Sequence, residues 1–116
     1  ATVLNCIGIG FQRGTHATWQ MVTNDGTGAP TLSDMGAPFA IALGGVLTLF
    51  IAAPPNGSSV WVRAVNEVTG AVFEQEITTD LPANTQFLSP RLFLNTGATA
   101  AAVAYDCSGL YIETDY

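Results

Sequence analysis

The stretch that decides the fold is residues 59–79, SVWVRAVNEVTGAVFEQEITT. Val, Ile, Phe and Trp alternate with polar residues on either side of Gly70, and this period of two is typical of half-buried strands. The two runs therefore predict a β-hairpin in which Gly70 takes a left-handed position in a short loop.

The register of this hairpin has two solutions. A three-residue loop pairs Val65 with Phe73 and Trp61 with Ile77, and places these four side chains on one apolar face. A two-residue turn at 69–70 shifts the pairing by one residue, which exchanges the faces of one strand. We prefer the longer loop because it gathers large apolar side chains on the side that would meet a core.

The composition is poor in charge. Only 10% of the 116 residues are charged, against about 25% in a typical soluble domain. The net charge is −6, and three arginines without any lysine form no basic patch, which argues against nucleic-acid binding. A Thr-rich β-protein needs few charges, but obligate subunit interfaces are also depleted in them. We prefer the second explanation and expect part of the surface to be covered by other subunits.

The length suits one domain over 1–116 with one core. The sequence begins at Ala1, which is compatible with Met removal and with a C-terminal fragment of a longer chain. The most apolar run, 39–53, is shorter than the about 20 residues of a membrane-spanning helix and contains two glycines. We interpret it as core strands around a glycine turn and expect no membrane insertion.

The two cysteines, Cys6 and Cys107, lie near opposite ends of the chain. They can form a disulfide if the terminal strands are neighbours, but buried free thiols are the commoner state in a domain with its own core. Two cysteines and the single His16 do not complete a structural zinc site. We therefore expect no cofactor.

Turn signals divide the remaining chain into short segments of strand character. The sequence predicts an all-β fold, an antiparallel β-sandwich of jelly-roll type with about eight or nine strands. Besides the hairpin, the expected strands lie at 3–11, 16–23, within 31–38, within 39–53, and at 86–88, 91–95, 99–107 and 110–113.

The order of several turns and strand ends carries a family resemblance. The pieces are TWQ at 18–20, NDGTG at 24–28, PPNGS at 54–58, TG at 69–70, TDLPA at 79–83, LSP at 88–90 and LYIETDY at 110–116. In this order and spacing, over nearly the whole chain, the sequence resembles the C-terminal, lectin-like β-sandwich domains of bacteriophage tail fibres and tailspikes. The resemblance implies a homotrimer on the virion that binds bacterial surface polysaccharide, locks the trimer, or does both.

Two aromatic pairs are candidates for carbohydrate binding. Trp61 and Arg63 lie two apart on one strand, so an indole face for a sugar ring and a donor for its hydroxyls share one side. Tyr111 and Glu113 repeat the spacing near the C-terminus, where they can line a sugar groove or a three-fold interface. The structural alternative for the first pair is a core Trp61 with a salt-bridged Arg63. For the second pair it is an ordinary edge strand whose acidic side chains discourage pairing with another strand.

Two further groups are weaker candidates. Asn24 and Asp25 open a Gly-rich loop whose oxygens could hold Ca²⁺, although the alternate acids of a calcium loop are missing and a plain turn is favoured. Glu74 and Glu76 face one side of a strand, about 7 Å apart by strand rise, and are candidates for the paired carboxylates of a glycosidase. No accompanying base or oxyanion constellation is found, so we expect no enzyme.

The leading hypothesis is glycan recognition; a trimerisation cap and a small glycosidase are the alternatives.

Overall fold

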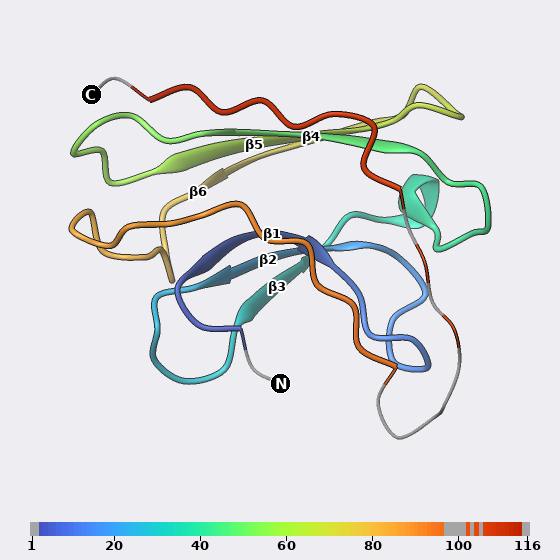
Figure 1. Cartoon of the computed structure of the whole chain (residues 1–116), viewed down its shortest axis with the longest axis horizontal. Helices are drawn as coiled ribbons and strands as arrows, with labels where there is room; N and C mark the ends of the chain where they lie inside the picture. The colour runs from blue at the N-terminus through green and yellow to red at the C-terminus, as the bar shows by residue number, and fades with distance from the viewer. Residues whose placement is uncertain (1–2, 97–101, 103, 105, 115–116) are drawn as a thin grey trace.

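A computed structural model describes residues 3–96, 102, 104 and 106–114. These residues form two three-stranded antiparallel sheets that lie one above the other in Figure 1. The all-β prediction is confirmed. The predicted strand count is wrong for the described residues, which form six strands rather than eight or nine.

The first sheet contains β1 (Cys6–Gly10), β2 (Gln20–Asn24) and β3 (Thr31–Asp34), in that order, with β2 in the centre. A 3₁₀ turn, η1 (Ala37–Phe39), leads toward the second sheet. The expected edge strand within 31–38 is thus present as β3. The strands predicted at 3–11 and 16–23 are present in shorter form.

The second sheet contains β4 (Leu47–Ala52), β5 (Val60–Asn66) and β6 (Val72–Ile77), with β5 in the centre. The hairpin of β5 and β6 is the one predicted, and Gly70 has the expected positive φ of 75°. Its register, however, follows neither predicted solution. Val65 pairs with Val72, and Arg63 pairs with Glu74.

Compared with the predicted register, this register exchanges the inward and outward faces of β5. Val60, Val62 and Ala64 point into the sandwich, where each is buried, and Trp61 lies on the outward face. The predicted core face of Trp61, Val65, Phe73 and Ile77 is therefore wrong in its β5 half, because a one-residue slip exchanges every side chain of the slipped strand. Phe73 and Ile77 do pack against the core.

The core joins the two sheets along β2 and β5. Met21 of β2 packs with Val60 and Val62 of β5 and with Ile77 of β6. At the other end, Phe39 of η1 packs on Ala64, and its ring meets Phe73 edge to face at a centroid distance of 6.3 Å. Ala64 has no exposed surface, so the two aromatic rings meet over a small side chain.

Several expected strands are absent from the described residues. Of 39–53, only β4 is a strand. Phe39 is the last residue of η1, and the residues between η1 and β4 form a loop in which Leu43 is fully exposed. The segments 86–88, 91–95 and 110–113 are not paired in any described sheet, and the strand predicted at 99–107 lies largely outside the described residues. No helix in the described part of the chain is long and apolar enough to span a bilayer.

Asn66, the last residue of β5, sets the register of the hairpin. Its backbone N–H donates to the carbonyl of Ala71 at 2.9 Å, and its own carbonyl accepts the Gly70 N–H at 2.7 Å. Its side-chain Oδ1 accepts from the N–H groups of Val68 and Thr69 at 3.0 and 3.3 Å. A four-residue loop, 67–70, therefore replaces the shorter loops that the sequence predicted.

The Asn66 side chain also links the hairpin to the first half of the chain, because its Nδ2 donates to the carbonyl of Pro38 at 2.8 Å. We expect Asn66→Ala to lower the free energy of unfolding by about 1–2 kcal/mol, since it removes three modest hydrogen bonds. Urea denaturation measures this. Asn84→Ala, in an exposed loop, is the matched control and should leave the midpoint unchanged. Equal midpoints for the two variants would show that Asn66 does not set the loop.

Candidate functional site

The outward face of the second sheet carries the first predicted pair. Trp61 is 53% exposed, and Arg63 lies beside it on the same side of β5. The core alternative for Trp61 is thereby excluded. Because Trp61 and Arg63 are two residues apart, they share one face of the strand in any register. The register decides whether that face points to the core or to solvent.

Glu74 of β6 completes this arrangement. It stands directly opposite Arg63, and a 3.3 Å ion pair joins Arg63 Nη1 to Glu74 Oε1. Both side chains are more than half exposed, so the ion pair contributes little to stability but restrains the two charged ends. The sequence analysis gave a salt-bridged Arg63 as an alternative but did not identify Glu74 as the partner, because its preferred register placed Gln75 opposite Arg63.

The surroundings of Trp61 are shallow and are apolar on the β4 side, whereas Glu76 of β6 pairs with it on the other side. Ala52 of β4 pairs with Trp61 across the sheet, and Phe50 pairs with Arg63. A broad hollow over this surface is lined by Ala52, Trp61, Val62, Arg63 and Glu74. An exposed indole next to a fixed donor and a fixed acceptor can stack on one face of a ring and hydrogen-bond to its substituents.

The second predicted pair is held together locally. The Tyr111 hydroxyl donates to Glu113 Oε2 at 3.0 Å, which agrees with the prediction that the two side chains share one side. Both are exposed, and no hydrogen bond or ion pair joins either of these described residues to Trp61 or Arg63. In Figure 1 the segment 106–114 lies on the far side of the second sheet from the first sheet. Asp115 and Tyr116 lie outside the described residues.

The loop that begins at Asn24 and Asp25 is built as a turn. Asn24 Oδ1 accepts the Gly26 N–H at 2.6 Å, and Asp25 Oδ1 accepts the N–H and the hydroxyl of Thr27 at 2.8 and 2.7 Å. These oxygens are thus already occupied as acceptors. Among the described residues, no group of three or more His, Cys, Asp or Glu is placed to hold a metal ion.

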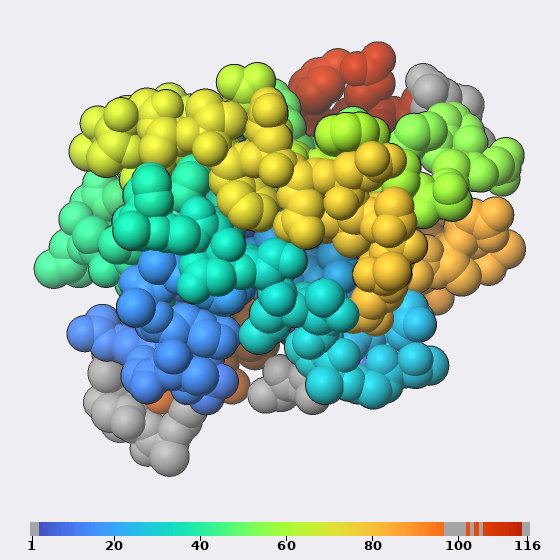
Figure 2. Space-filling model, turned by 180° about the vertical axis from the view of Figure 1, so that it is seen from behind, coloured from blue at the N-terminus to red at the C-terminus, as the bar shows by residue number. Residues whose placement is uncertain are grey.

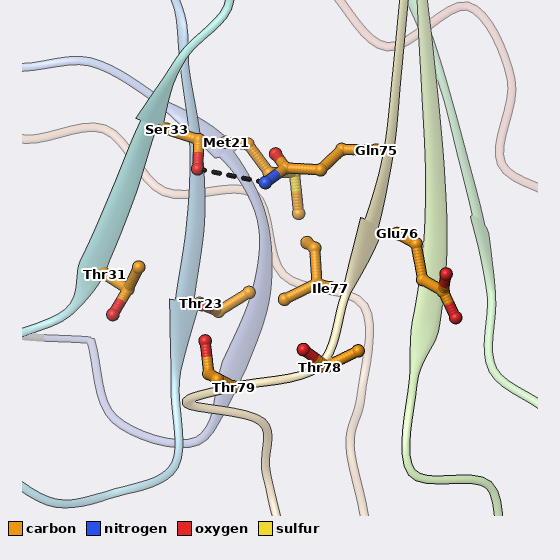
Figure 3. Close-up of a pocket in the computed structure, with 9 residues that line it drawn as sticks. All are labelled: Met21, Thr23, Thr31, Ser33, Gln75, Glu76, Ile77, Thr78 and Thr79. Atoms are coloured by element: carbon orange, nitrogen blue, oxygen red, sulfur yellow. Dashed lines mark hydrogen bonds between the residues drawn. The ribbon is translucent and has the colours of Figure 1, made fainter.

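A second concave feature lies between the sheets at the edge formed by β3 and β6. Figure 2 shows this face of the molecule, where the two elements meet, and Figure 3 shows the slot itself. Its lining is rich in hydroxyl groups. Figure 3 shows Thr23 opposite Ile77 and Ser33 opposite Gln75, whose Nε2 lies 3.4 Å from Ser33 Oγ. Its volume is about 160 Å³, below the roughly 300 Å³ at which ligand pockets begin.

Glu76 borders the slot only through its backbone position, because its side chain points to the opposite side of β6 in Figure 3. Glu74 and Glu76 therefore share the outward face, as their spacing predicted. Sequence reasoning gave no signal for the slot, since it depends on β3 and β6 meeting across the sandwich. The outward face offers the larger surface and is the better candidate site.

Asp80 links the first sheet to the end of the second. Its carboxylate accepts the backbone N–H of Asp25 at 2.9 Å and that of Thr31 at 2.8 Å, so it pins both ends of the loop between β2 and β3. Hydrogen bonds from Asp25 and then from Thr31 hold the pKa of Asp80 below its ordinary value. The pKa of the Cys6 thiol is raised, mainly by burial and further by the nearby Asp80 charge. Cys6 and Cys107 are both free thiols.

Asp34 is held in a similar way at the other end of the first sheet. Its Oδ1 accepts the Thr18 hydroxyl at 2.5 Å and the Gly36 N–H at 2.7 Å. These two hydrogen bonds lower the pKa of Asp34.

Comparison with known protein families, with curated proteins and with solved structures finds no match for this chain.

The two aspartates predict an acid-sensitive fold. Because their folded pKa values lie below the ordinary 3.8, the stability they add is present above that pH and is lost as the pH falls through the folded values. Asp80→Asn should flatten the dependence of stability on pH below 3.8, and Asp34→Asn should do so additively. Asparagine also suits the positive φ of 53° at Asp80.

Urea midpoints measured across this acid range test the prediction. Glu67→Gln, on the exposed hairpin loop, is the control and should leave the slope as in the wild type. A wild-type slope in the Asp80→Asn, Asp34→Asn double variant would contradict it.

Proposed function

We propose that the protein is a non-catalytic host-recognition domain of a phage tail fibre or tailspike, which binds bacterial surface polysaccharide as a homotrimer on the virion. The observation that carries the binding proposal is the exposed Trp61 beside the Arg63–Glu74 ion pair. The virion setting and the trimer rest on the sequence resemblance and on the scarcity of charge.

The chemistry of the outward face suits a sugar. The apolar face of a pyranose ring can stack on the Trp61 indole, and the hydroxyls around the ring both donate and accept hydrogen bonds. Arg63 supplies donors only and Glu74 acceptors only, so the pair matches both properties of a hydroxyl. The ion pair holds the two groups 3.3 Å apart before a ligand arrives, which reduces the ordering cost of binding.

A shallow site of this kind binds weakly by itself. A polysaccharide repeats the same epitope, and an oligomer presents several copies of the site, so later contacts form at a high effective concentration. Avidity of this kind can exceed the affinity of one site by roughly 10²–10⁴. The absence of a deep pocket at Trp61 is therefore compatible with firm attachment.

A structural trimerisation cap is the second candidate function. It is favoured by large apolar side chains that stand exposed in the C-terminal part of the chain, among them Phe87, Leu92, Leu110 and Tyr111. In the assembled form these segments would supply the strands of the jelly roll that the sequence predicted. A small glycosidase, using Glu74 and Glu76, is the third and least supported hypothesis.

Trp61→Ala tests the leading proposal. We expect it to abolish binding on an array of bacterial polysaccharides and to shift Tm by no more than about 5 °C, because the indole is largely outside the core. Val68→Ala removes an apolar side chain that is 66% exposed on the hairpin loop, and this control should bind as the wild type does.

Other outcomes select other functions. Loss of binding in Tyr111→Ala, with binding intact in Trp61→Ala, would move the site to the C-terminal pair. A wild-type protein that assembles but binds no glycan would identify the domain as a structural trimerisation cap. Release of reducing ends from the polysaccharide would identify a glycosidase.

A further inference from the structure

β4 presents an open edge that nothing in its sequence protects. It is the first strand in the order β4-β5-β6, so one of its sides pairs with no described strand. Its sequence, LTLFIA, contains no charge and no proline. Exposed edge strands of soluble proteins are usually blunted by such residues, because an open edge is a template for another strand.

The side chains of β4 point to the same conclusion. Phe50 and Ile51 are neighbours in sequence and therefore lie on opposite faces of the strand. Phe50 is 57% exposed and Ile51 is 42% exposed. Both faces of β4 are thus partly exposed at this end, although Ile51 lies on the side of the sheet that faces the core.

The free backbone groups of this edge can be identified. Glu67 N–H donates to the Val46 carbonyl at 2.9 Å, which fixes the alternation of paired and unpaired positions along β4. By this alternation the N–H groups of Thr48 and Phe50 point toward β5, and those of Leu49 and Ile51 point away from it. The edge therefore offers N–H groups at Leu49 and Ile51 to an added strand.

The same chain contains a strand-like segment that pairs with none of the six described strands. Leu92, Phe93 and Leu94 are consecutive, and each is at least 46% exposed. Consecutive large apolar residues put apolar surface on both faces of an extended segment, as in strands buried between two layers. Within the segment, the Arg91 guanidinium lies 5.3 Å from the centroid of the Phe93 ring.

We propose that residues 91–94 of a second copy of this chain add to the open edge of β4 as a fourth strand of the second sheet. The open edge lacks a strand, and the segment lacks a sheet. In Figure 1 the chain before residue 96, drawn in orange, runs past the first sheet and not along β4, so the pairing joins two copies. The added strand would cover Phe50 and Ile51 by apolar side chains on both faces.

The contact is heterologous, because one copy gives a segment and the next copy gives an edge. Repetition of such a contact closes into a ring when the rotation between copies permits it, and a trimer is one such ring. The inference therefore rests on the self-association in the proposed function and is independent of glycan binding.

Variants of the full chain test the pairing. Ile51→Pro removes an N–H that β5 does not use, and prolines are tolerated at such edge positions. We expect Ile51→Pro and Phe93→Asp each to reduce the assembled wild type to the 12.1 kDa monomer in sedimentation velocity at micromolar concentration, with an unchanged far-UV circular dichroism spectrum. Val68→Asp, on the exposed hairpin loop, is the control and should remain assembled.

Cross-linking between differently labelled copies identifies the partners. In a background with Cys6→Ser and Cys107→Ser, protein carrying Ile51→Cys is refolded together with protein carrying Phe93→Cys and treated with a short bis-maleimide. A product that contains one chain of each kind is expected. Products made only of Ile51→Cys chains would show that two β4 edges pair with each other, which overturns the exchange.

The remaining outcomes are also decisive. A wild type that assembles, with both variants still assembled, overturns the strand exchange but leaves the trimer and the glycan site standing. A monomeric wild type overturns both the exchange and the trimer, while the glycan array still decides the binding proposal. A misfolded Ile51→Pro leaves the test to Phe93→Asp and to the cross-link.

Discussion

The register of β5 against β6 is the constraint on which the rest of the structure depends, and Asn66 imposes it. Its side chain caps the N–H groups of Val68 and Thr69 inside the loop, and its backbone closes the ladder with Ala71. The loop is therefore longer than a tight turn. Since side chains alternate between the faces of a strand, this choice puts Val62 and Ala64 in the core and Trp61 outside it.

The limited volume of the core explains why small side chains of β5 point inward and Trp61 points outward. The two sheets are bridged by medium and small side chains of β5, and the Phe39 and Phe73 rings meet edge to face over Ala64. An indole at an inward position of β5 would add volume to a space that these rings already fill, and overpacked cores are strained. The close packing of the interior thus accounts for the exposure of Trp61. The exposed indole does not contribute the stabilisation that its burial would give.

The sequence predicted the β class, the hairpin and the edge strand β3, because period-two alternation and turn residues are local signals. It could not predict the hairpin register, since residues 60–65 carry apolar side chains on both faces and Arg63 is the one charged residue among them. Local patterns also failed at 40–46, where an apolar stretch without alternation forms a loop and not a strand. At the site, the proximity of Trp61 and Arg63 followed from their spacing. Their exposure and their link to Glu74 depended on the register and could not be foreseen.

The two proposed surfaces of the second sheet, the Trp61 face and the β4 edge, must be usable at the same time. Trp61 must stay open to bind a sugar, whereas the β4 edge must be covered by another copy. Neighbouring strands lie about 4.8 Å apart, so a strand added beyond β4 lies roughly 10 Å from β5 and leaves the indole uncovered. Its outward side chains would instead continue the apolar floor beside Phe50, which is next to Arg63 in the sheet. The neighbouring copy would then border the sugar site without blocking it, so assembly and recognition can use the same sheet.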